Sequence, residues 1–236
     1  MDKLDVKEIK HFYENVDGVW PLHNKWHDIN QLEIKSYIKK LKIEKSYKIL
    51  NAGSGGNNYG LSIEMYHMDI AANKILNQKN FVVGSIEAIP FEDETFDVVI
   101  CVGSVLNYCD AISAITEMSR VLKRGGLLVI EFENSYSFEF KNTTAFKSNA
   151  AIITTSYFNR PHKMWVFSSK YICRILQECN MKVNDLYAYH ILSSIAYYYI
   201  KDENKAAKYS VFDKILRHIP FIHRYSGNII LCCTKK

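Results

Sequence analysis

Short apolar runs alternate with more polar segments along the middle of the chain. The runs cover residues 47–50, 63–68, 80–83, 96–102 and 127–132. Each is nearly continuous in apolar residues, which is typical of central parallel strands that are covered on both faces. Because helical patterns separate such runs, the sequence predicts an α/β fold in which strands and helices alternate.

Helical periodicity is clearest between the last two of these runs. Apolar residues recur at helical spacing from Ile112 to Leu122. We expect Lys123 and Arg124 in the last turn, where cations interact favourably with the helix dipole, and Gly125-Gly126 at the helix end.

The two ends of the chain follow other patterns. Residues 3–41 are predicted to be helical, and residues 133–165 an aromatic-rich loop. A helix over 168–180, a strand over 182–189, a long insert and a final strand over 228–233 follow. The final strand is expected to pair antiparallel at the far side of the sheet.

Composition narrows the class of protein. A chain of 236 residues fits one α/β domain with a substantial core. The net charge of +5 is small and the lysines are scattered, so nucleic acid is not an expected partner. No apolar stretch is long enough to span a bilayer, and the charged start of the chain does not resemble a secretory signal.

The six cysteines show neither a metal-ligand spacing nor a disulfide framework. We interpret them as reduced thiols of a cytoplasmic protein, and we expect no metal site.

The segment Asn51-Ala52-Gly53-Ser54-Gly55-Gly56-Asn57 follows the first apolar run directly. Gly53 and Gly55 can adopt positive φ and leave room for a ligand above the strand end. The turn therefore predicts a binding site for a nucleotide-like cofactor, although a plain strand-to-helix turn would look the same.

Asp69 adds weight to the cofactor hypothesis. It ends the second strand-like run, at about the spacing from the glycine turn at which an acid reaches ribose hydroxyls in dinucleotide folds. A nicotinamide cofactor would require a third glycine where this chain has Asn58, so hydride transfer is disfavoured.

Four separated motifs together resemble class I S-adenosylmethionine-dependent methyltransferases, in particular the type 11 methyltransferase domain. They are the glycine turn at 51–57, the acid Asp69, the segments 84–91 and 96–100, and the helix and turn at 117–126. The resemblance implies a Rossmann-like three-layer sandwich whose seven-stranded, mostly parallel sheet has an antiparallel last strand. We expect one domain over 1–236, with an N-terminal helical cap at about 1–44 and a lid-like insert at about 190–226.

The resemblance also implies that the protein binds S-adenosyl-L-methionine and releases S-adenosyl-L-homocysteine. Gly53, Ser54 and Gly55 would border the methionine tail, and Asp69 would bind the ribose. The other positions that match the family's cofactor site are Asn51, Ile70, Ser85, Ile86, Glu87, Cys101, Val102 and Gly103.

Three positions depart from the family pattern. Asn51 replaces the usual acid, and Ser85 stands where many relatives carry Asp beside the adenine. Asn57 replaces the last glycine, but it tolerates a left-handed backbone better than most residues, so the turn is expected to persist. Glu87 would serve at the rim of the adenine in place of Ser85.

The acceptor side is defined less sharply. The aromatic residues Tyr13, Trp20 and Trp26 are candidates because the N-terminal segment caps the cofactor in relatives, although they could equally be core. Asn107 and Tyr108 are candidates because they follow the fourth strand, at the edge where open α/β folds bind ligands.

A general base is required only for a hydroxyl or a protonated amine. Glu133, His23 and His162 are the candidate residues, and the sequence does not choose among them.

The leading functional hypothesis is methyl transfer to an O or N atom of a small molecule. A peptide or lipid-linked glycan acceptor, or a non-catalytic cofactor-binding protein, remains open. The insert mixes Tyr, Ile and Lys residues, which would suit an acceptor pocket or contact with a membrane surface. The oligomeric state is not predicted.

Overall fold

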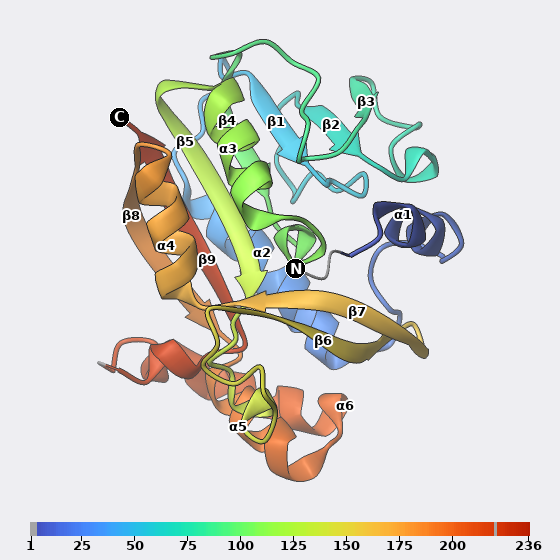
Figure 1. Ribbon diagram of the computed structural model, residues 1–236, viewed down its shortest axis with the longest axis vertical. Helices are drawn as coiled ribbons and strands as arrows, with labels where there is room; N and C mark the ends of the chain where they lie inside the picture. The colour runs from blue at the N-terminus through green and yellow to red at the C-terminus, as the bar shows by residue number, and fades with distance from the viewer. Residues whose placement is uncertain (1–3, 220) are drawn as a thin grey trace.

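A seven-stranded sheet forms the centre of the protein, in the order β3-β2-β1-β4-β5-β9-β8 (Figure 1). The computed structural model describes residues 4–219 and 221–236. The strands of this sheet are β1 (Ile49–Ala52), β2 (Tyr66–Asp69), β3 (Phe81–Val83), β4 (Phe96–Cys101), β5 (Leu122–Glu133), β8 (Met181–Tyr189) and β9 (Asn228–Lys235). Strands β1 to β5 pair in parallel, and β9 runs antiparallel to both of its neighbours. The predicted fold class is confirmed, and β8, not the reversed strand, forms the edge.

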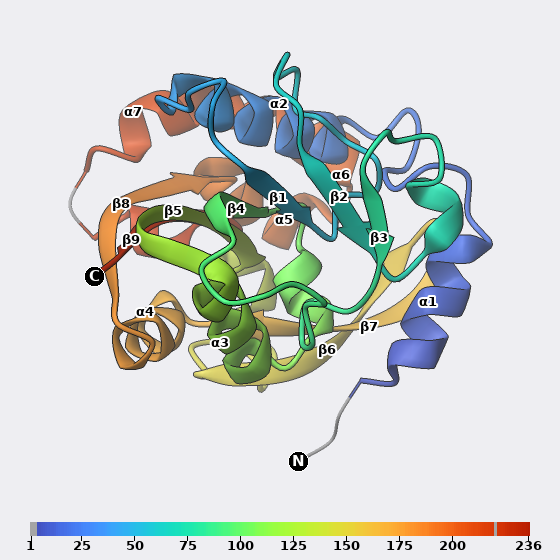
Figure 2. The same cartoon turned by 90° about the horizontal axis from the view of Figure 1, so that it is seen from above.

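Helices cover both faces of the sheet (Figure 2). Helix α2 (Lys25–Lys40) buries Ile34 and Ile38 against one face. Helices α3 (Ala111–Val121) and α4 (Ser169–Glu178) pack on the other face. Each begins with a residue whose side chain accepts a backbone hydrogen bond of the first turn, and this satisfies donors that a helix start leaves free.

The predicted alternation of strands and helices holds only in part. An α-helix connects β4 to β5, whereas turns and a short 3₁₀ segment at Ala72–Lys74 join β1, β2 and β3. The N-terminal helix α2 covers the sheet where a crossover helix would otherwise lie. Helix α3 also ends at Val121, so Lys123 and Arg124 belong to β5 and not to the last helical turn.

The segment predicted to be a loop at 133–165 contains most of a long antiparallel hairpin instead. Strands β6 (Ala150–Tyr157) and β7 (Arg160–Phe167) pair residue by residue. Phe158 and Asn159 connect them, both with positive φ, as the favoured two-residue hairpin turn requires. The prediction of a loop was wrong, and the hairpin extends past the carboxyl ends of the central strands (Figure 1).

The N-terminal segment, which was predicted to be helical, forms two separate helices. Helix α1 (Val6–Glu14) lies apart from α2, beside the hairpin and the 3₁₀ segment Ala72–Lys74 (Figure 2). Residues 1–3 of the predicted cap lie outside the described residues.

The insert is helical and lies below the sheet in Figure 1. It contains α5 (Ile191–Ile200), α6 (Glu203–Ala206) and α7 (Asp213–Leu216), and residue 220 lies outside the described residues. The Asp213 carboxylate accepts hydrogen bonds from the Ile191 and Leu192 amides at 3.0 Å each, which joins α7 to the start of α5. The role of the insert as a lid stays a prediction.

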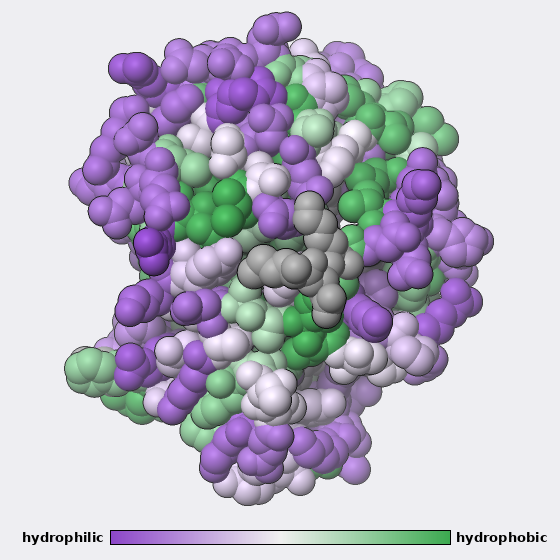
Figure 3. Space-filling view, in the orientation of Figure 1, coloured by the Kyte–Doolittle hydropathy of each residue, from purple (hydrophilic) through white to green (hydrophobic). Residues whose placement is uncertain are grey.

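Hydrophilic side chains dominate the rim of the face in Figure 3, and apolar ones interrupt them toward its middle. Nowhere in the described ranges does a helix combine the length and the apolar character needed to cross a membrane.

Candidate functional site

The glycine turn after β1 is shaped by backbone conformations that only glycine adopts easily. Gly53, Gly55 and Gly56 have φ of +70°, +51° and +77°. A Cβ atom on Gly53 would lie 2.3 Å from Val105 Cγ1, and one on Gly55 would lie 2.7 Å from Val19 Cγ1. Both distances are shorter than carbon atoms tolerate, so the turn leaves no room for side chains at these positions.

Asn57 is not the left-handed residue that the sequence suggested. Tyr59 takes that conformation, with φ of +53°, and the Asn57 Oδ1 atom accepts a hydrogen bond from its amide at 2.7 Å. The asparagine therefore stabilises the turn through its side chain.

Asp69 sits at the end of β2 and faces the turn. Its Oδ2 atom accepts a hydrogen bond from the Gly55 amide, and its Oδ1 atom one from the Ala71 amide, both at 2.9 Å. Burial raises the pKa of this carboxyl, while the backbone donors and Lys74 oppose the shift. Since each carboxylate oxygen accepts more than one hydrogen bond, Asp69 is held in place and can still receive ribose hydroxyls.

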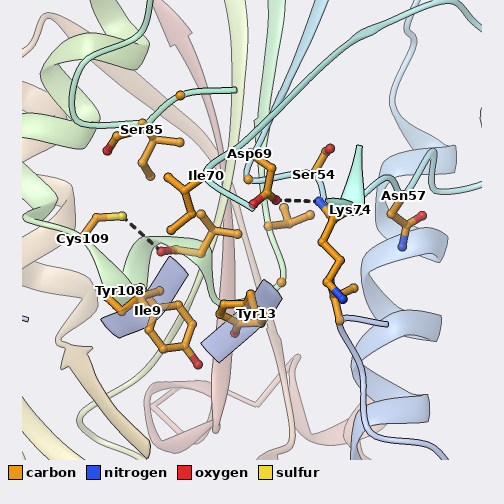
Figure 4. Close-up of a pocket in the computed structure, with 18 of the residues that line it drawn as sticks. Ile9, Tyr13, Ser54, Asn57, Asp69, Ile70, Lys74, Ser85, Tyr108 and Cys109 are labelled. Carbon is orange, nitrogen blue, oxygen red and sulfur yellow. Dashed lines mark hydrogen bonds between the residues drawn. The ribbon is translucent and has the colours of Figure 1, made fainter. Parts of the chain in front are cut away.

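These groups surround a cavity of about 890 Å³, part of which is open to solvent. Figure 4 shows Asp69 and Ile70 on one side of the cavity and Ile9 and Tyr13 of α1 on the other. The predicted cofactor residues that line it are Gly53, Ser54, Gly55, Asp69, Ile70, Ser85, Ile86, Val102 and Gly103. The glycine floor, the carboxylate and the apolar side chains fit a nucleoside with a polar tail.

Three predicted cofactor residues do not line this cavity. The fully buried Asn51 donates to the Asn57 carbonyl at 2.6 Å and accepts from the Tyr59 hydroxyl at 3.2 Å, so it supports the turn from behind. Glu87 accepts a hydrogen bond from the Asp110 amide at the start of α3. Cys101 is fully buried, and burial raises the pKa of its thiol.

Glu131 is a functional candidate that the sequence did not reveal. Its buried carboxylate accepts hydrogen bonds from the Gly103 and Ser104 amides at 2.9 and 2.6 Å. Tyr189 and Asn228 donate to its other oxygen at 3.0 and 2.6 Å. Glu131 therefore fixes the loop after β4, although its position inside an apolar strand gave no sign of this.

A second cavity, of about 560 Å³, adjoins the first. Tyr13, Trp20, Gly103 and Tyr108 line both cavities. Of the predicted residues, Trp26 and Glu133 also line the second one. The structure thus brings four of the five acceptor candidates and one candidate base together.

The remaining candidates lie elsewhere. Asn107 is buried and accepts from the Glu133 amide at 3.0 Å while it donates to the Trp165 carbonyl at 2.7 Å. His162 lines neither cavity, and its ring lies 4.3 Å from that of Phe12; burial lowers its pKa. His23 is exposed and lines neither cavity.

Several residues of the two cavities were missed by sequence reasoning. They come from α1, the 3₁₀ segment Ala72–Lys74, the segment between β5 and β6, the hairpin and the insert, and include Ile9, Lys74, Glu139, Tyr157, Met164 and Glu203. The consecutive β-branched residues at 152–155 were a signal for a strand, and hence for Tyr157. Nothing in the sequence pattern indicated Lys74 or Glu203.

Comparison with known proteins agrees with this geometry. Residues 46–130 match the family model of a methyltransferase domain. An uncharacterized protein of Methanocaldococcus jannaschii is 29% identical over 144 residues, which cover 56% of this chain and 64% of that protein. A ubiquinone/menaquinone biosynthesis C-methyltransferase of Pasteurella multocida is 30% identical over 152 residues, which cover 53% and 56% of the two chains. The chain therefore spans less than two thirds of the length of these curated relatives.

Solved structures share the fold at low sequence identity. The [4+2]-cyclase SpnF matches with a TM-score of 0.64 at 14% identity, over 100% of this chain and 98% of the cyclase. Geranyl diphosphate C-methyltransferase from Streptomyces coelicolor, solved with S-adenosyl-L-homocysteine, matches with a TM-score of 0.60 at 12% identity, over 98% and 97% of the chains. Residues 46–130 thus match a methyltransferase domain in sequence, and the chain as a whole shares its fold with solved S-adenosylmethionine-dependent methyltransferases.

Proposed function

We propose that the protein transfers a methyl group from S-adenosyl-L-methionine to an O or N atom of a small molecule. The observation that carries this proposal is the pair of adjoining cavities. Because Tyr13, Trp20, Gly103 and Tyr108 line both, ligands in the two cavities would meet at this shared wall. Such an arrangement holds two reactants close together, which is the main contribution a protein makes to a displacement reaction.

In this proposal the first cavity binds the cofactor. Asp69 accepts hydrogen bonds from the ribose hydroxyls, and the amides and glycines of residues 53–55 border the methionine tail. Ile70 and Ile86 enclose the adenine, and Ser85 lies at its edge. The cofactor supplies an activated methyl group on its sulfonium, so the protein needs no nucleophile of its own.

The second cavity binds the acceptor, with Glu133 as the general base. Among the three candidate bases, Glu133 is the one that lines this cavity. Burial raises its pKa well above the ordinary value, with further contributions from the charges of Glu139, Glu131 and Glu203. A carboxylate with a raised pKa is a stronger base, which suits removal of a proton from a hydroxyl or an ammonium group.

A labelled-methyl assay tests the proposed function. The protein is incubated with cofactor that carries a labelled methyl group and with a panel of small amines and alcohols, and products are identified by mass. We expect label in at least one acceptor and loss of transfer in Glu133→Gln, with cofactor binding retained.

The contrary result would be a protein that binds the cofactor but transfers no label to any acceptor. This outcome would favour the non-catalytic alternative. SpnF shares this fold and is named as a cyclase. Because a fold alone does not determine the reaction, the assay is needed to decide between methyl transfer and the non-catalytic alternative.

A further inference from the structure

The second cavity combines three carboxylates with several aromatic rings. Glu133, Glu139 and Glu203 contribute the carboxylates. They come from the end of β5, the segment after it and α6 of the insert, so three parts of the chain direct acids into one space. Tyr13, Trp20, Trp26, Tyr108 and Tyr157 contribute the rings.

The carboxylates have few partners within the protein. Glu133 is contacted by the Ser104 hydroxyl at 3.4 Å, and Glu139 by the Ser137 hydroxyl at 2.8 Å. Glu203 accepts from the Asn24 side chain. Over residues 4–219 and 221–236, none of the three forms an ion pair with Lys, Arg or His.

The protein also provides no counter-charge from the walls of the cavity. None of the described residues that line it is Lys or Arg. His27 lines it, but burial lowers the pKa of His27 to about 4, so the ring is neutral near pH 7. Burial raises the pKa of Glu133 and Glu139, and neighbouring carboxylates add to both shifts, whereas Lys201, which does not line the cavity, opposes the shift of Glu139.

The aromatic rings are an independent observation that indicates the same type of ligand. Faces of Trp and Tyr rings attract cations, and groups of such rings enclose ammonium ligands in other proteins. In the part of the chain that the structure describes, no Lys or Arg lies over any of the five rings.

Other ligands fit the cavity less well. A metal ion requires ligands that converge on one point, and among the described residues no three His, Cys, Asp or Glu side chains do so. A neutral alcohol would leave the acidic groups without a counter-charge. An ammonium group offers three hydrogen-bond donors and a positive charge, which matches carboxylates that only accept.

We propose that the acceptor is an organic amine, which enters the second cavity as a cation and is held there by the carboxylates of Glu133, Glu139 and Glu203 and by the surrounding rings. Methylation of the amine rests on the proposed function, but its binding does not depend on methyl transfer. An ammonium nitrogen has no free electron pair, so it must lose a proton before it can react. Glu133 can take this proton: the N–H bond breaks, the carboxyl O–H bond forms, and a neutral amine and a neutral carboxyl result.

Paired ligands that differ only in charge test the proposal. Calorimetry measures binding of hexylamine, 2-phenylethylamine and 1,6-diaminohexane, each compared with the alcohol of the same shape. We expect at least one amine to bind roughly tenfold or more tightly than its alcohol, the range expected for hydrogen bonds to a charged group. Glu139→Gln and Glu203→Gln should each remove most of that preference.

Glu178→Gln provides the matched control, because Glu178 is exposed on α4 and lies outside both cavities. It should leave the preference for amines unchanged. Since a substitution in the cavity could impair folding, thermal unfolding of each variant is recorded, and Glu203→Gln on the surface insert offers a second site.

Equal or tighter binding of the alcohols, or no binding of any amine, would overturn the proposal. So would a preference for amines that survives both cavity substitutions. Cofactor binding measured on the same samples separates this inference from the proposed function. A protein that binds the cofactor but not amines refutes only the inference, and one that binds amines but not the cofactor refutes only the proposed function.

Discussion

Three glycines after β1 determine how closely the chain can approach a ligand. Their positive φ values and the contacts that a Cβ would make are separate constraints, and Gly55 is subject to both. Gly125 is subject to one alone, because its φ is +76° while no atom beyond its chain neighbours lies within 4 Å of the position that a Cβ would take. A comparison of Gly55 with Gly125 therefore separates the cost of backbone strain from the cost of a steric clash.

Gly55→Ala should destabilise the protein more than Gly125→Ala. The left-handed conformation costs alanine about 1–2 kcal/mol at either site. At Gly55 the collision with Val19 adds about 1–3 kcal/mol. Urea unfolding of the two variants measures the difference, and Val19→Ala in the Gly55→Ala background should recover part of it. Equal losses of stability in Gly55→Ala and Gly125→Ala would show that the Val19 side chain moves aside without cost.

Among single residues, the sequence predicted those whose role depends on local geometry. The glycines and Asp69 were identified because a turn and a strand end follow directly from neighbouring residues. Asn51 was assigned to the cofactor by its place in the motif, yet its amide is buried behind the turn. From a single sequence, a residue that makes a buried hydrogen bond cannot be distinguished from one that contacts a ligand.

The β6–β7 hairpin connects the core to the N-terminal segment. The Tyr157 hydroxyl donates to the Val19 carbonyl at 2.7 Å, and the Lys74 ammonium donates to the Val16 carbonyl at 2.5 Å. Both bonds hold the segment between α1 and α2, which provides Trp20 to both cavities. The hairpin and the 3₁₀ segment at Ala72–Lys74 thus position a wall of the site.

Tyr157→Phe should loosen this segment without unfolding the domain. One lost hydrogen bond costs about 0.5–1.5 kcal/mol. We expect faster amide exchange at residues 16–20 and unchanged exchange in β5, measured by hydrogen–deuterium exchange. Unaltered exchange at residues 16–20 would mean that other contacts hold the segment, and faster exchange in β5 would indicate global destabilisation.

Helices and strands differed in how well the sequence predicted them. The central strands β1, β4 and β5 were recognisable because burial makes them largely apolar, whereas the edge strand β3 exposes Phe81 and Val83. The sequence predicts a loop where the hairpin forms, because residues 150–157 are Ala-Ala-Ile-Ile-Thr-Thr-Ser-Tyr and lack the alternation of apolar and polar residues that marks a half-buried strand. The break between α1 and α2 was missed although Gly18 and Pro21, residue types that interrupt helices, lie within it.

In the protein as a whole, buried carboxyl groups collect near the carboxyl ends of the strands. Burial raises the pKa of Glu131, Glu133 and Glu139, and for Glu139 the value is about 7. Folding therefore makes these groups bind protons more tightly than they do in the unfolded chain. Between their ordinary pKa and the raised one, the folded state holds more protons, so stability falls as the pH rises.

The contribution of these carboxyl groups to the free energy of unfolding should decrease from about pH 5 to about pH 7. Buried histidines such as His190, whose pKa burial lowers to about 3, contribute in the opposite direction. Within this range, each carboxyl group that is protonated in the folded state and ionised in the unfolded chain lowers the free energy of unfolding by up to about 1.4 kcal/mol per pH unit. Glu139→Gln should make the decrease shallower, whereas Glu178→Gln on the surface of α4 should not. Urea unfolding across this range measures the difference in stability between the wild type and Glu139→Gln, and a difference that shifts in favour of the wild type as the pH rises would contradict the assigned direction.

The second cavity could not be predicted as a unit. It is assembled from α2, the loop after β4, the hairpin and the insert, which lie far apart in the chain. Only the packing of these parts shows that Glu133 and Glu203 share a space. The sequence therefore predicted the fold class and many of the residues that line the first cavity, but not that three carboxylates share the second.

Whether the cavity beside Asp69 holds the cofactor can be decided by calorimetric titration of S-adenosyl-L-homocysteine into the wild-type protein and into Asp69→Ala. We expect one site per chain in the wild type and, because two hydrogen bonds to a charged group are lost, affinity roughly tenfold to a hundredfold weaker in the variant. Absence of binding to a folded wild-type protein, or equal affinity in the variant, would contradict the assignment of the cavity between β1 and β2.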